Sequence, residues 1–367
     1  TADGSVVGRG DFATDVPGLT RWRDEYGLAP GTVVGLETGT VSFFVARILQ
    51  RLKLKPKVLD AAEVRIKAQR PNQKCDRRDA FEICDGVRRD IYRCEVHVPS
   101  LVVSSARSAI SRRRHCVRGS TREINAAKHL LRAAGLGVLA TGALKTEKAW
   151  EKLLKKLATE PELQGHVRAH YALWRGAVEQ LAELDGTLAD MARHEELRED
   201  LEILRTIPGV GPVVSMTLVA GFSETARFPS AKHAASYVGL VPSTYSSGER
   251  EASGHITKRG SPEMRSMLCE AAQHAAKPTH PLYPYFSALS ARRGYNMAIT
   301  ATAHRLCRIA FRMLRTRSPF DVRQLNVEAC AHVRTRRVDY KRKDRSLPRG
   351  AKALASTTSK ATAAASS

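Results

Sequence analysis

Three acidic residues in the first quarter of the sequence have the types and spacing that suit a metal site. Glu37 ends a short apolar run, and Asp76 and Asp79 lie three positions apart at the start of a predicted helix. Residues at i and i+3 share one face of a helix, so both Asp carboxylates can point to one place. Carboxylate oxygens bind Mg²⁺ or Mn²⁺, hard cations that hold phosphate oxygens during a displacement reaction. The alternative is structural, because Asp residues also cap helix starts and pair with neighbouring arginines on a surface.

A pair of serines followed by a glycine forms the second candidate centre. Ser246 and Ser247 precede Gly248 in a predicted loop, and cationic side chains follow in the sequence. A serine hydroxyl in such a loop can attack a phosphodiester when cations stabilise the negative charge that develops. Serine-rich loops are common, so the pattern alone leaves a structural role open. The cations are Lys258, Arg259 and Arg265.

A glycine-rich turn at residues 207–211 precedes a second apolar run. Gly209 and Gly211 form a Gly-x-Gly turn that is predicted to open a helix, as in helix-hairpin-helix elements. Such a turn presents backbone N–H groups and the positive end of the helix dipole, which can hold a phosphodiester without reading its base sequence. The alternative is a tight connection between two helices that binds no ligand.

The charge of the chain indicates a polyanionic partner. Its 60 Lys and Arg residues exceed its 37 Asp and Glu residues, which gives a net charge of +23 at neutral pH. Such an excess favours nucleic acid over a membrane surface, and the patterned apolar sequence disfavours a basic ribosomal protein. One predicted helix, residues 101–135, carries many basic residues with Glu123 as its only acid, which is typical of a face that lies along phosphates. Within this helix we single out Arg112, Arg113 and Arg114.

The elements that must position these residues fall into three predicted regions. Residues 32–36 and 57–59 have strand patterns on either side of a helical pattern, a β–α–β order that indicates an α/β domain over residues 1–98. Residues 99–200 have long helical periods, typical of a helical, coiled-coil spacer that can also join two copies of the chain. We expect a mostly α-helical C-terminal domain over residues 201–322.

Several features indicate a cytoplasmic protein. The 7 cysteines form no Cys-x-x-Cys pair, and no apolar stretch is long enough to span a bilayer. Residues 336–367 have the composition of a disordered basic tail. At the other end, Asp3 and Gly4 have the pattern of a hairpin turn that leads into a strand at residues 5–7. Because no strand precedes that turn, the pattern predicts that an N-terminal strand is missing.

Short segments along the chain, taken together, resemble the DEDD transposases of the insertion sequence 110 family, which are serine recombinases guided by a bridge RNA. The resemblance runs from about Asp3 to Asp321. Residues 35–39 (GLETG) are similar to the family's Glu-x-x-Gly segment with one residue fewer, and residues 75–80 (CDRRDA) are similar to its Asp-x-x-Asp-Ala segment. Five further pieces follow in the family's order, at residues 207–211, 227–231, 237–242, 247–248 and 256–265.

The resemblance implies a ribonuclease H-like (RuvC-like) N-terminal domain with a four-carboxylate Mg²⁺ site, a helical middle, and a C-terminal domain that supplies a nucleophilic serine. Carried over to this sequence, Glu37, Asp76 and Asp79 are the second, third and fourth acids. Ser247 is the nucleophile that forms a phosphoserine link to DNA, with Ser246 as its nearest competitor. Asp3 does not occupy the place of the family's first acid, so one acid of the four is missing. The implied partners are DNA, a guide RNA and further copies of the chain, as a dimer or tetramer.

Three functions remain open on these grounds. The first is a DNA transposase or recombinase in which Ser247 attacks a phosphodiester with the help of Mg²⁺. The second is a ribonuclease H-like metal nuclease that uses activated water, and the third is a catalytically impaired nucleic-acid-binding remnant, which the missing acid favours. The sequence contains no Walker A loop, His-Glu-x-x-His helix or Gly-x-Ser-x-Gly elbow, which disfavours an NTPase, a zinc protease and an α/β-hydrolase.

Overall fold

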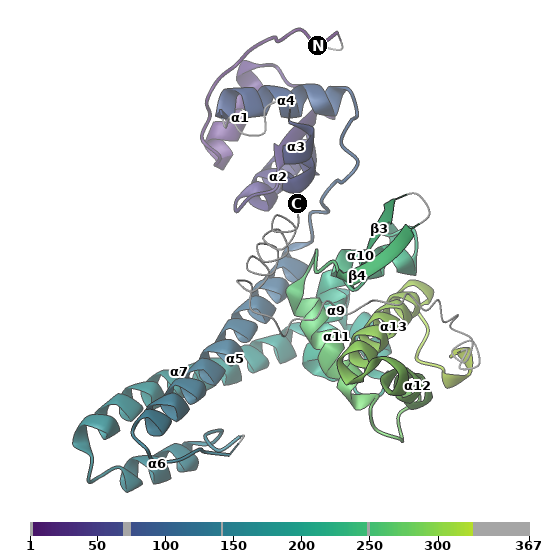
Figure 1. Cartoon of the computed structure of the whole chain (residues 1–367). Coiled ribbons are helices and arrows are strands. Elements are labelled where there is room, and N and C mark those ends of the chain that lie inside the picture. Colours follow the sequence, from purple (N-terminus) through teal and green to yellow (C-terminus); the bar gives the residue numbers. More distant parts are fainter. Residues whose placement is uncertain (1–2, 69–74, 141, 248–249, 326–367) are drawn as a thin grey trace, which may run out of the picture. The chain divides into compact units, whose positions relative to one another are not determined.

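The computed structural model describes residues 3–68, 75–140, 142–247 and 250–325, and for residues 244–247, 250–253 and 324 it describes the backbone (Figure 1). The described part is mostly helical, with small two-stranded sheets. The chain divides into two compact units, Thr1–Ser108 and Ala109–Ser367. The predicted basic tail at residues 336–367 lies outside the described residues.

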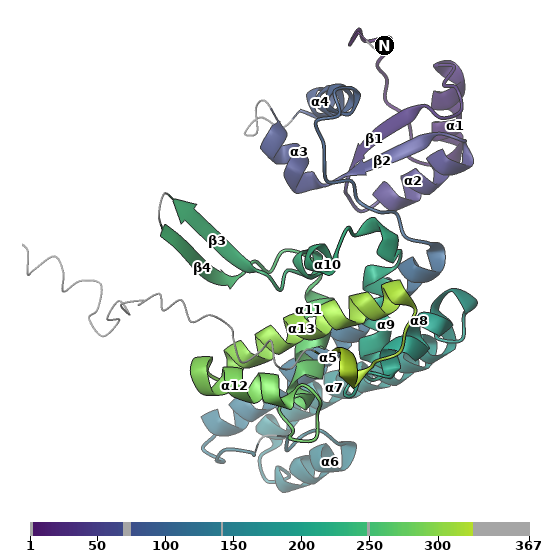
Figure 2. The same cartoon turned by 90° about the vertical axis from the view of Figure 1, so that its right-hand side faces the viewer.

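The first unit is built on a pair of parallel strands, β1 (Val33–Glu37) and β2 (Lys55–Leu59), which α2 (Ser42–Arg51) connects (Figure 2). The strands pair without a register shift, from Val33 opposite Lys55 to Glu37 opposite Leu59. The predicted β–α–β order is therefore confirmed. On the apolar side of α2, Ala46, Ile48 and Leu49 are buried, and so are Val58 and Leu59 at the end of β2, against which this helix packs.

Among the described residues, this unit also contains α1 (Val16–Glu25), α3 (Ala61–Lys67) and α4 (Asp76–Arg88). Helix α4 packs against β1, where Gly35 lies close to Ile83 and Val87. Before α1, the Asp3 side chain accepts a hydrogen bond from the Ser5 N–H, so a turn forms there. The strand predicted at residues 5–7 is wrong, because these residues pair with no strand in the part of the chain that the structure describes.

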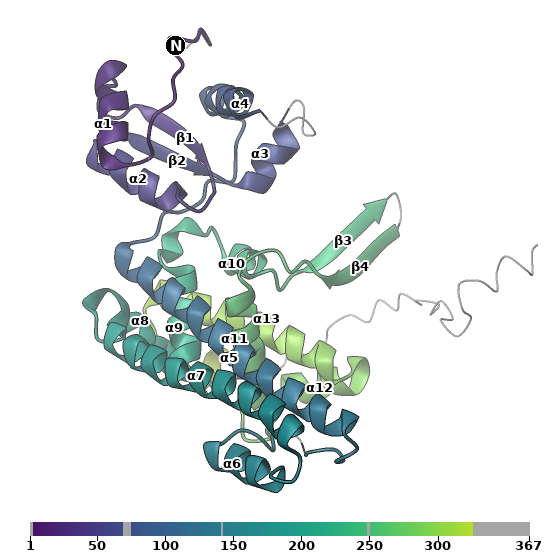
Figure 3. The same cartoon turned by 90° about the vertical axis from the view of Figure 1, so that its left-hand side faces the viewer.

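The second unit contains a long antiparallel helix pair made by α5 (Leu101–Ala133), which begins in the first unit, and α7 (Pro161–Met191) (Figure 3). Arg113 on α5 pairs with Asp185, and Glu123 further along α5 pairs with His170, so the two helices run in opposite directions. Helix α6 (Glu147–Lys156) packs on this pair through Trp150, which is fully buried beside Trp174. The long helices predicted for this region are confirmed.

A group of shorter helices surrounds α9 (Pro212–Phe222), whose residues 215–222 are all buried. A helix that is apolar on every side must be covered on every side, and α8 and α11 pack directly against it. Its terminal Phe222 contacts Phe228 and Phe311 edge to face. The other helices of the group are α8 (Glu195–Arg205), α10 (Ala231–Val238), α11 (Pro262–His274), α12 (Tyr283–Arg293) and α13 (Tyr295–Thr316), with short 3₁₀ turns at Thr225–Arg227 and Val322–Gln324.

An antiparallel hairpin, β3 (Pro242–Ser247) and β4 (Arg250–Ile256), lies between α10 and α11 in the sequence (Figure 2). Its pairing shifts register between Pro242 and Thr244, which marks an irregularity near its base. None of the helices in the described ranges is long and apolar enough to cross a bilayer.

Candidate functional site

Glu37 lies at the carboxyl end of β1, the edge at which open α/β sheets place their active groups. Its side chain is exposed. The next residue fixes this edge, because the Thr38 N–H donates to the Leu59 carbonyl oxygen at 2.9 Å. The Thr38 hydroxyl oxygen in turn accepts a hydrogen bond from the Ala61 N–H at 3.0 Å. The ends of β1 and β2 are thus tied to the start of α3, and Glu37 projects from a well-defined backbone.

Asp76 and Asp79 both lie in the first turn of α4, as predicted from their spacing. The N-cap residue of this helix is Cys75, so neither Asp occupies that position. The Cys75 side chain makes no capping hydrogen bond. Acidic side chains in a first turn are favoured by the helix dipole, which gives this pair a structural role as well. The neighbouring Arg78 pairs with Glu82 at 3.7 Å.

The three acids do not form a complete metal site in the described residues. Across those ranges, no three His, Cys, Asp or Glu side chains lie close enough together to hold a metal ion. The fold brings Asp76 and Asp79 onto one helix turn and places Glu37 at the end of the strand on which that helix packs. The carboxylates alone therefore do not fit a bound Mg²⁺ as they lie.

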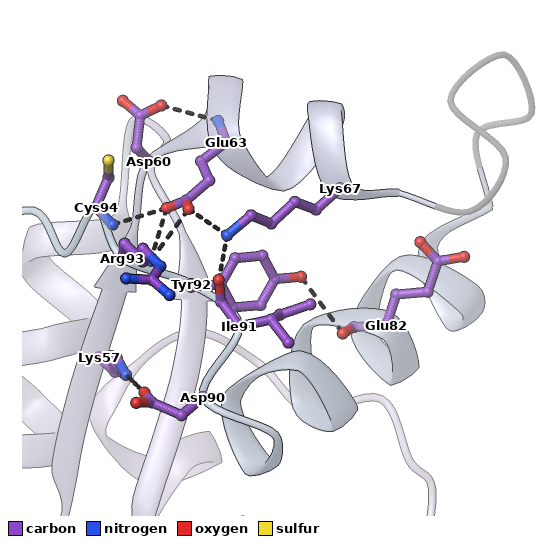
Figure 4. A network of polar contacts seen from close by, with 10 residues as sticks. All are labelled: Lys57, Asp60, Glu63, Lys67, Glu82, Asp90, Ile91, Tyr92, Arg93 and Cys94. Carbon is purple, nitrogen blue, oxygen red and sulfur yellow. Dashed lines mark hydrogen bonds and ion pairs between the residues drawn. The ribbon is translucent and has the colours of Figure 1, made fainter.

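A polar network centred on Glu63 holds the same edge of the sheet, and the sequence reasoning missed it (Figure 4). The Glu63 carboxylate accepts hydrogen bonds from the Lys67 ammonium at 2.5 Å and from the backbone N–H groups of Arg93 and Cys94, the latter at 2.7 Å. Burial opposes ionisation of this carboxyl, but the Lys67 and backbone hydrogen bonds outweigh it and lower the pKa of Glu63 to about 2. Glu63 is thus held as a carboxylate.

The network joins α3 to the segment that follows α4. Asp60 caps α3 by accepting from the Glu63 N–H at 2.9 Å, and its own N–H donates to the Cys94 carbonyl oxygen. Lys67 also donates to the Ile91 carbonyl oxygen. A sequence signal existed, because an Asp followed three residues later by Glu is the pattern of a capping box. The contacts of this network with residues 91–94 depend on tertiary structure, so no local sequence pattern predicts them.

Ser246 and Ser247 lie in a strand and not in the predicted loop. Both belong to β3, where Ser246 pairs with Glu251 and Ser247 with Arg250 on β4. Strand pairing with β4 satisfies the backbone here, which a local reading of the serine-rich sequence could not foresee. The predicted flanking residue Gly248 lies outside the described residues. The backbone thus places Ser247 at the distal end of the hairpin.

The base of this hairpin is tightly anchored to the helices on either side. The Thr257 N–H donates to the Val241 carbonyl oxygen at 2.9 Å, and the Lys258 N–H donates to that of Gly239. Gly239 and Gly260 both have positive φ, and a Cβ atom at either would collide with the backbone of the opposite segment. The two legs of the hairpin are therefore held together at one point, between the end of α10 and the start of α11.

Of the three predicted cations near the serine, Arg265 has a structural role. Its Nη1 donates to the Val238 carbonyl oxygen at 2.9 Å and to the Gly260 carbonyl oxygen at 3.1 Å, which binds the two legs of the hairpin base together. Lys258 and Arg259 are exposed in the same segment. These two side chains remain predicted contacts for nucleic acid.

The predicted Gly-x-Gly turn does open a helix, since Gly211 is the N-cap residue of α9. Gly209 has φ of 80° and lies directly against the His274 side chain. His280 is buried and fixes the turn from the other side, because its Nδ1 accepts from the Leu282 N–H and its Nε2 therefore donates to the Pro208 carbonyl oxygen, each at 3.0 Å. Burial lowers the pKa of His280, so the neutral ring is favoured.

Comparison with known proteins shows which family this chain resembles. A family profile described as "Transposase IS116/IS110/IS902 family" matches residues 201–286. A transposase for insertion sequence element IS1111A from Coxiella burnetii is 27% identical over 252 residues, which cover 66% of this chain and 67% of that protein. A probable family 20 transposase from Pseudomonas aeruginosa is 27% identical over 300 residues, 80% of this chain and 86% of that protein. Over most of its length the chain is therefore similar to transposases of this family.

The transposase is accordingly an enzyme that acts on DNA. The residues matched by the family profile include the turn before α9, the whole β3–β4 hairpin and α11. A pilin gene-inverting protein from Moraxella bovis is also similar, at 31% identity over 131 residues, which cover 35% of this chain and 41% of that protein. The family match therefore falls on the part of the transposase that holds the hairpin and its anchors.

On the basic helix α5 of the transposase, two of the three arginines singled out from the sequence are paired with acids. Arg112 is exposed, but the Arg113 Nε donates to Asp185 on α7 at 2.6 Å, and the Arg114 Nη1 donates to Glu263 on α11 at 2.7 Å. The acids that α5 lacks in its own sequence are supplied by neighbouring helices. Because these partners are 72 and 149 residues away, no local pattern reveals them.

Proposed function

We propose that this transposase breaks and rejoins DNA strands through Ser247 at the distal end of the β3–β4 hairpin. The serine hydroxyl oxygen attacks a DNA phosphorus, a phosphoserine bond forms, and the bond from phosphorus to one deoxyribose oxygen breaks. The hydroxyl proton passes to the departing sugar oxygen. A sugar hydroxyl of another strand then attacks the same phosphorus and releases the serine, so each phosphodiester is conserved through the exchange.

The observation that carries the proposal is the anchoring of the hairpin base. Nucleophilic attack requires that the oxygen be held in line with the bond that breaks, and small errors in position slow such reactions strongly. Two backbone hydrogen bonds, two close glycine contacts and the bridge from Arg265 fix the point from which the hairpin extends. Lys258 and Arg259 lie exposed beside this base, where they can bind phosphates.

The remaining parts of the proposal concern the N-terminal unit and the partners. We assign the N-terminal region a ribonuclease H-like fold, which the parallel β1–β2 pair with α4 packed on β1 supports. The proposed guide RNA and a homo-oligomer are supported by the net charge of +23 and by the long α5–α7 pair, respectively. Binding of Mg²⁺ by Glu37, Asp76 and Asp79 remains a prediction. A cytoplasmic location of the protein also remains a prediction.

The test uses the full chain with duplex DNA that carries the ends of its insertion sequence, and it detects covalent protein–DNA adducts on a denaturing gel. We expect Ser247→Ala to abolish the adduct and Ser246→Ala, the matched control, to retain it. An adduct that persists in Ser247→Ala would refute the assignment of Ser247 as the nucleophile. Cleavage without any adduct would favour a nuclease that uses water.

A further inference from the structure

One ion pair connects the long helix α5 to the start of α11, at the base of the hairpin. Arg114 and Glu263 are in contact at 2.7 Å, and their side chains are 31% and 25% exposed. The contact joins two helices that are far apart in the sequence. Arg114 is also one of the three arginines that the sequence assigns to nucleic-acid binding, so its engagement with an acid needs an explanation.

Glu263 is built into the first turn of α11. One of its oxygens accepts from Arg114 and the other from the Ser261 hydroxyl at 3.1 Å, while the Ser261 oxygen caps the helix by accepting from the Met264 N–H. Burial opposes ionisation of Glu263, but the hydrogen bond from Arg114 outweighs it and lowers the pKa of the carboxyl. The carboxylate is therefore the form that the surroundings favour, and it orients the helix start.

This helix start is also where the β4 leg of the hairpin enters α11. Gly260 immediately precedes the N-cap Ser261, and Arg265 in the same first turn donates to the Gly260 and Val238 carbonyl oxygens. A rotation of the α11 start would therefore move both legs of the hairpin base. Met264 adds a second constraint, because it lies against Gly221 of α9 without space for a Cβ atom.

The adjacent arginine provides an internal comparison. Arg113 contacts Asp185 at 2.6 Å, a distance close to that of the Arg114 pair, but Asp185 belongs to α7 and not to the helices that flank the hairpin. Two neighbouring ion pairs of α5 thus differ in what they hold. The first joins α5 to its antiparallel partner, and the second joins it to the hairpin.

We propose that Arg114 and Glu263 form a positioning pair that fixes the start of α11 on α5 and so sets the direction of the hairpin that carries Ser247. This inference rests on the proposed role of Ser247. Neither residue touches the reacting atoms. Arg114 acts through Glu263, and Glu263 through the α11 start and the Gly260 segment. Movements of the long helix pair are thereby coupled to the position of the nucleophile.

The test is a charge exchange with the full chain. Arg114→Glu and Glu263→Arg are made singly and together, and the rate of the Ser247 adduct is measured at saturating DNA. Each single variant should slow the rate by roughly fivefold or more, since partly shielded ion pairs couple by about 1 kcal/mol and like charges repel in the singles. The exchanged pair should recover to within about twofold of wild type, because opposite charges again face each other. Asp185→Asn should leave the rate unchanged.

DNA affinity separates the positioning role from a phosphate contact. If the two residues form a positioning pair, each single variant lowers the adduct rate at saturating DNA, and the exchanged pair restores it. A small shift in DNA affinity can accompany the altered net charge without affecting this result. If Arg114 binds a phosphate instead, affinity and its salt dependence fall in Arg114→Glu, and the exchange does not restore the saturated rate. That result overturns the inference. To guard against misfolding, Arg114→Gln and Glu263→Gln are measured in parallel, and strictly additive rate effects in their double variant also overturn it. A wild-type adduct on another residue instead refutes the role of Ser247.

Discussion

The helices around α9 and the sheet edge around Glu63 are stabilised in opposite ways. Around α9, eight consecutive residues are buried, and Phe222, Phe228 and Phe311 meet edge to face. At the sheet edge, the buried apolar cluster is small, made by Leu59, Ile83 and Tyr92, and the Glu63 carboxylate, with 13% side-chain exposure, connects α3 to the segment that follows α4. Apolar packing holds the first region, and an ionised side chain holds the second.

This difference matters because each region supports a different set of predicted functional residues. The helices that carry the turn at Gly209 and the base of the hairpin pack around α9 through apolar contacts, which depend little on pH. The end of β1 with Glu37 rests on the Glu63 network, whose strength depends on charge. We therefore expect the two regions to respond differently to truncation of a side chain and to acid.

The largest effect is expected from Phe222→Ala in the apolar region. The side chain is fully buried, and its loss should lower the free energy of unfolding by about 3–5 kcal/mol, because a large cavity forms in a packed core. Protection of the α9 amides from hydrogen exchange, measured by mass spectrometry, reports this change. The control is Leu173→Ala on α7, where the side chain is 60% exposed and a change below about 0.5 kcal/mol is expected. Equal effects of the two variants would contradict the comparison.

A smaller, pH-dependent effect is expected from Glu63→Gln in the polar region. Glu63 has a pKa of about 2, below its ordinary value of 4.5, so its contribution is present above pH 4.5 and is lost as the pH falls toward 2. Neutralising it should cost about 2 kcal/mol at pH 7 after allowance for solvent screening, and little at the acid end.

The measurement is hydrogen exchange of the β1 and β2 amides between pH 3 and pH 7, corrected for the intrinsic rate. Wild type should lose protection as the pH falls, and Glu63→Gln should show a flatter profile. Glu95→Gln, which alters an exposed carboxylate close in sequence, serves as the control and should follow wild type. A Glu63→Gln profile parallel to wild type would show that the network does not hold this edge.

The sequence predicted those elements whose signal is local. The β–α–β order, the long helices and the Gly-x-Gly turn that opens α9 all follow from periodicity and turn chemistry, and the structure contains them. The placement of Asp76 and Asp79 in one helix turn follows in the same way. Family resemblance, rather than spacing, linked these pieces into a transposase.

What the sequence did not predict depends on contacts between distant segments. Arg113 and Arg114 look free along α5 because their acids lie on α7 and α11. From the sequence, Arg265 is a predicted phosphate ligand. In the fold, its guanidinium group donates to two backbone carbonyl oxygens. Each case has one physical cause, since a charged side chain in a basic chain binds the nearest acid or carbonyl, and only the tertiary structure decides which is nearest.

The smallest effect is expected at His280, a polar residue inside the apolar region. Burial lowers its pKa, so the folded state binds fewer protons than the unfolded state, and its contribution is present above pH 6.5 and is lost as the pH falls below that value. His280→Gln keeps a donor for the Pro208 carbonyl oxygen but cannot titrate, and should change the free energy of unfolding at pH 7.5 by about 1 kcal/mol or less. Urea unfolding at pH 7.5 and pH 5.0 measures both quantities, with His233→Gln, an exposed site on α10, as the control. Wild type and His233→Gln should lose more stability at pH 5.0 than His280→Gln does. Equal losses in all three would show that the titration of His280 does not contribute to the stability of this region.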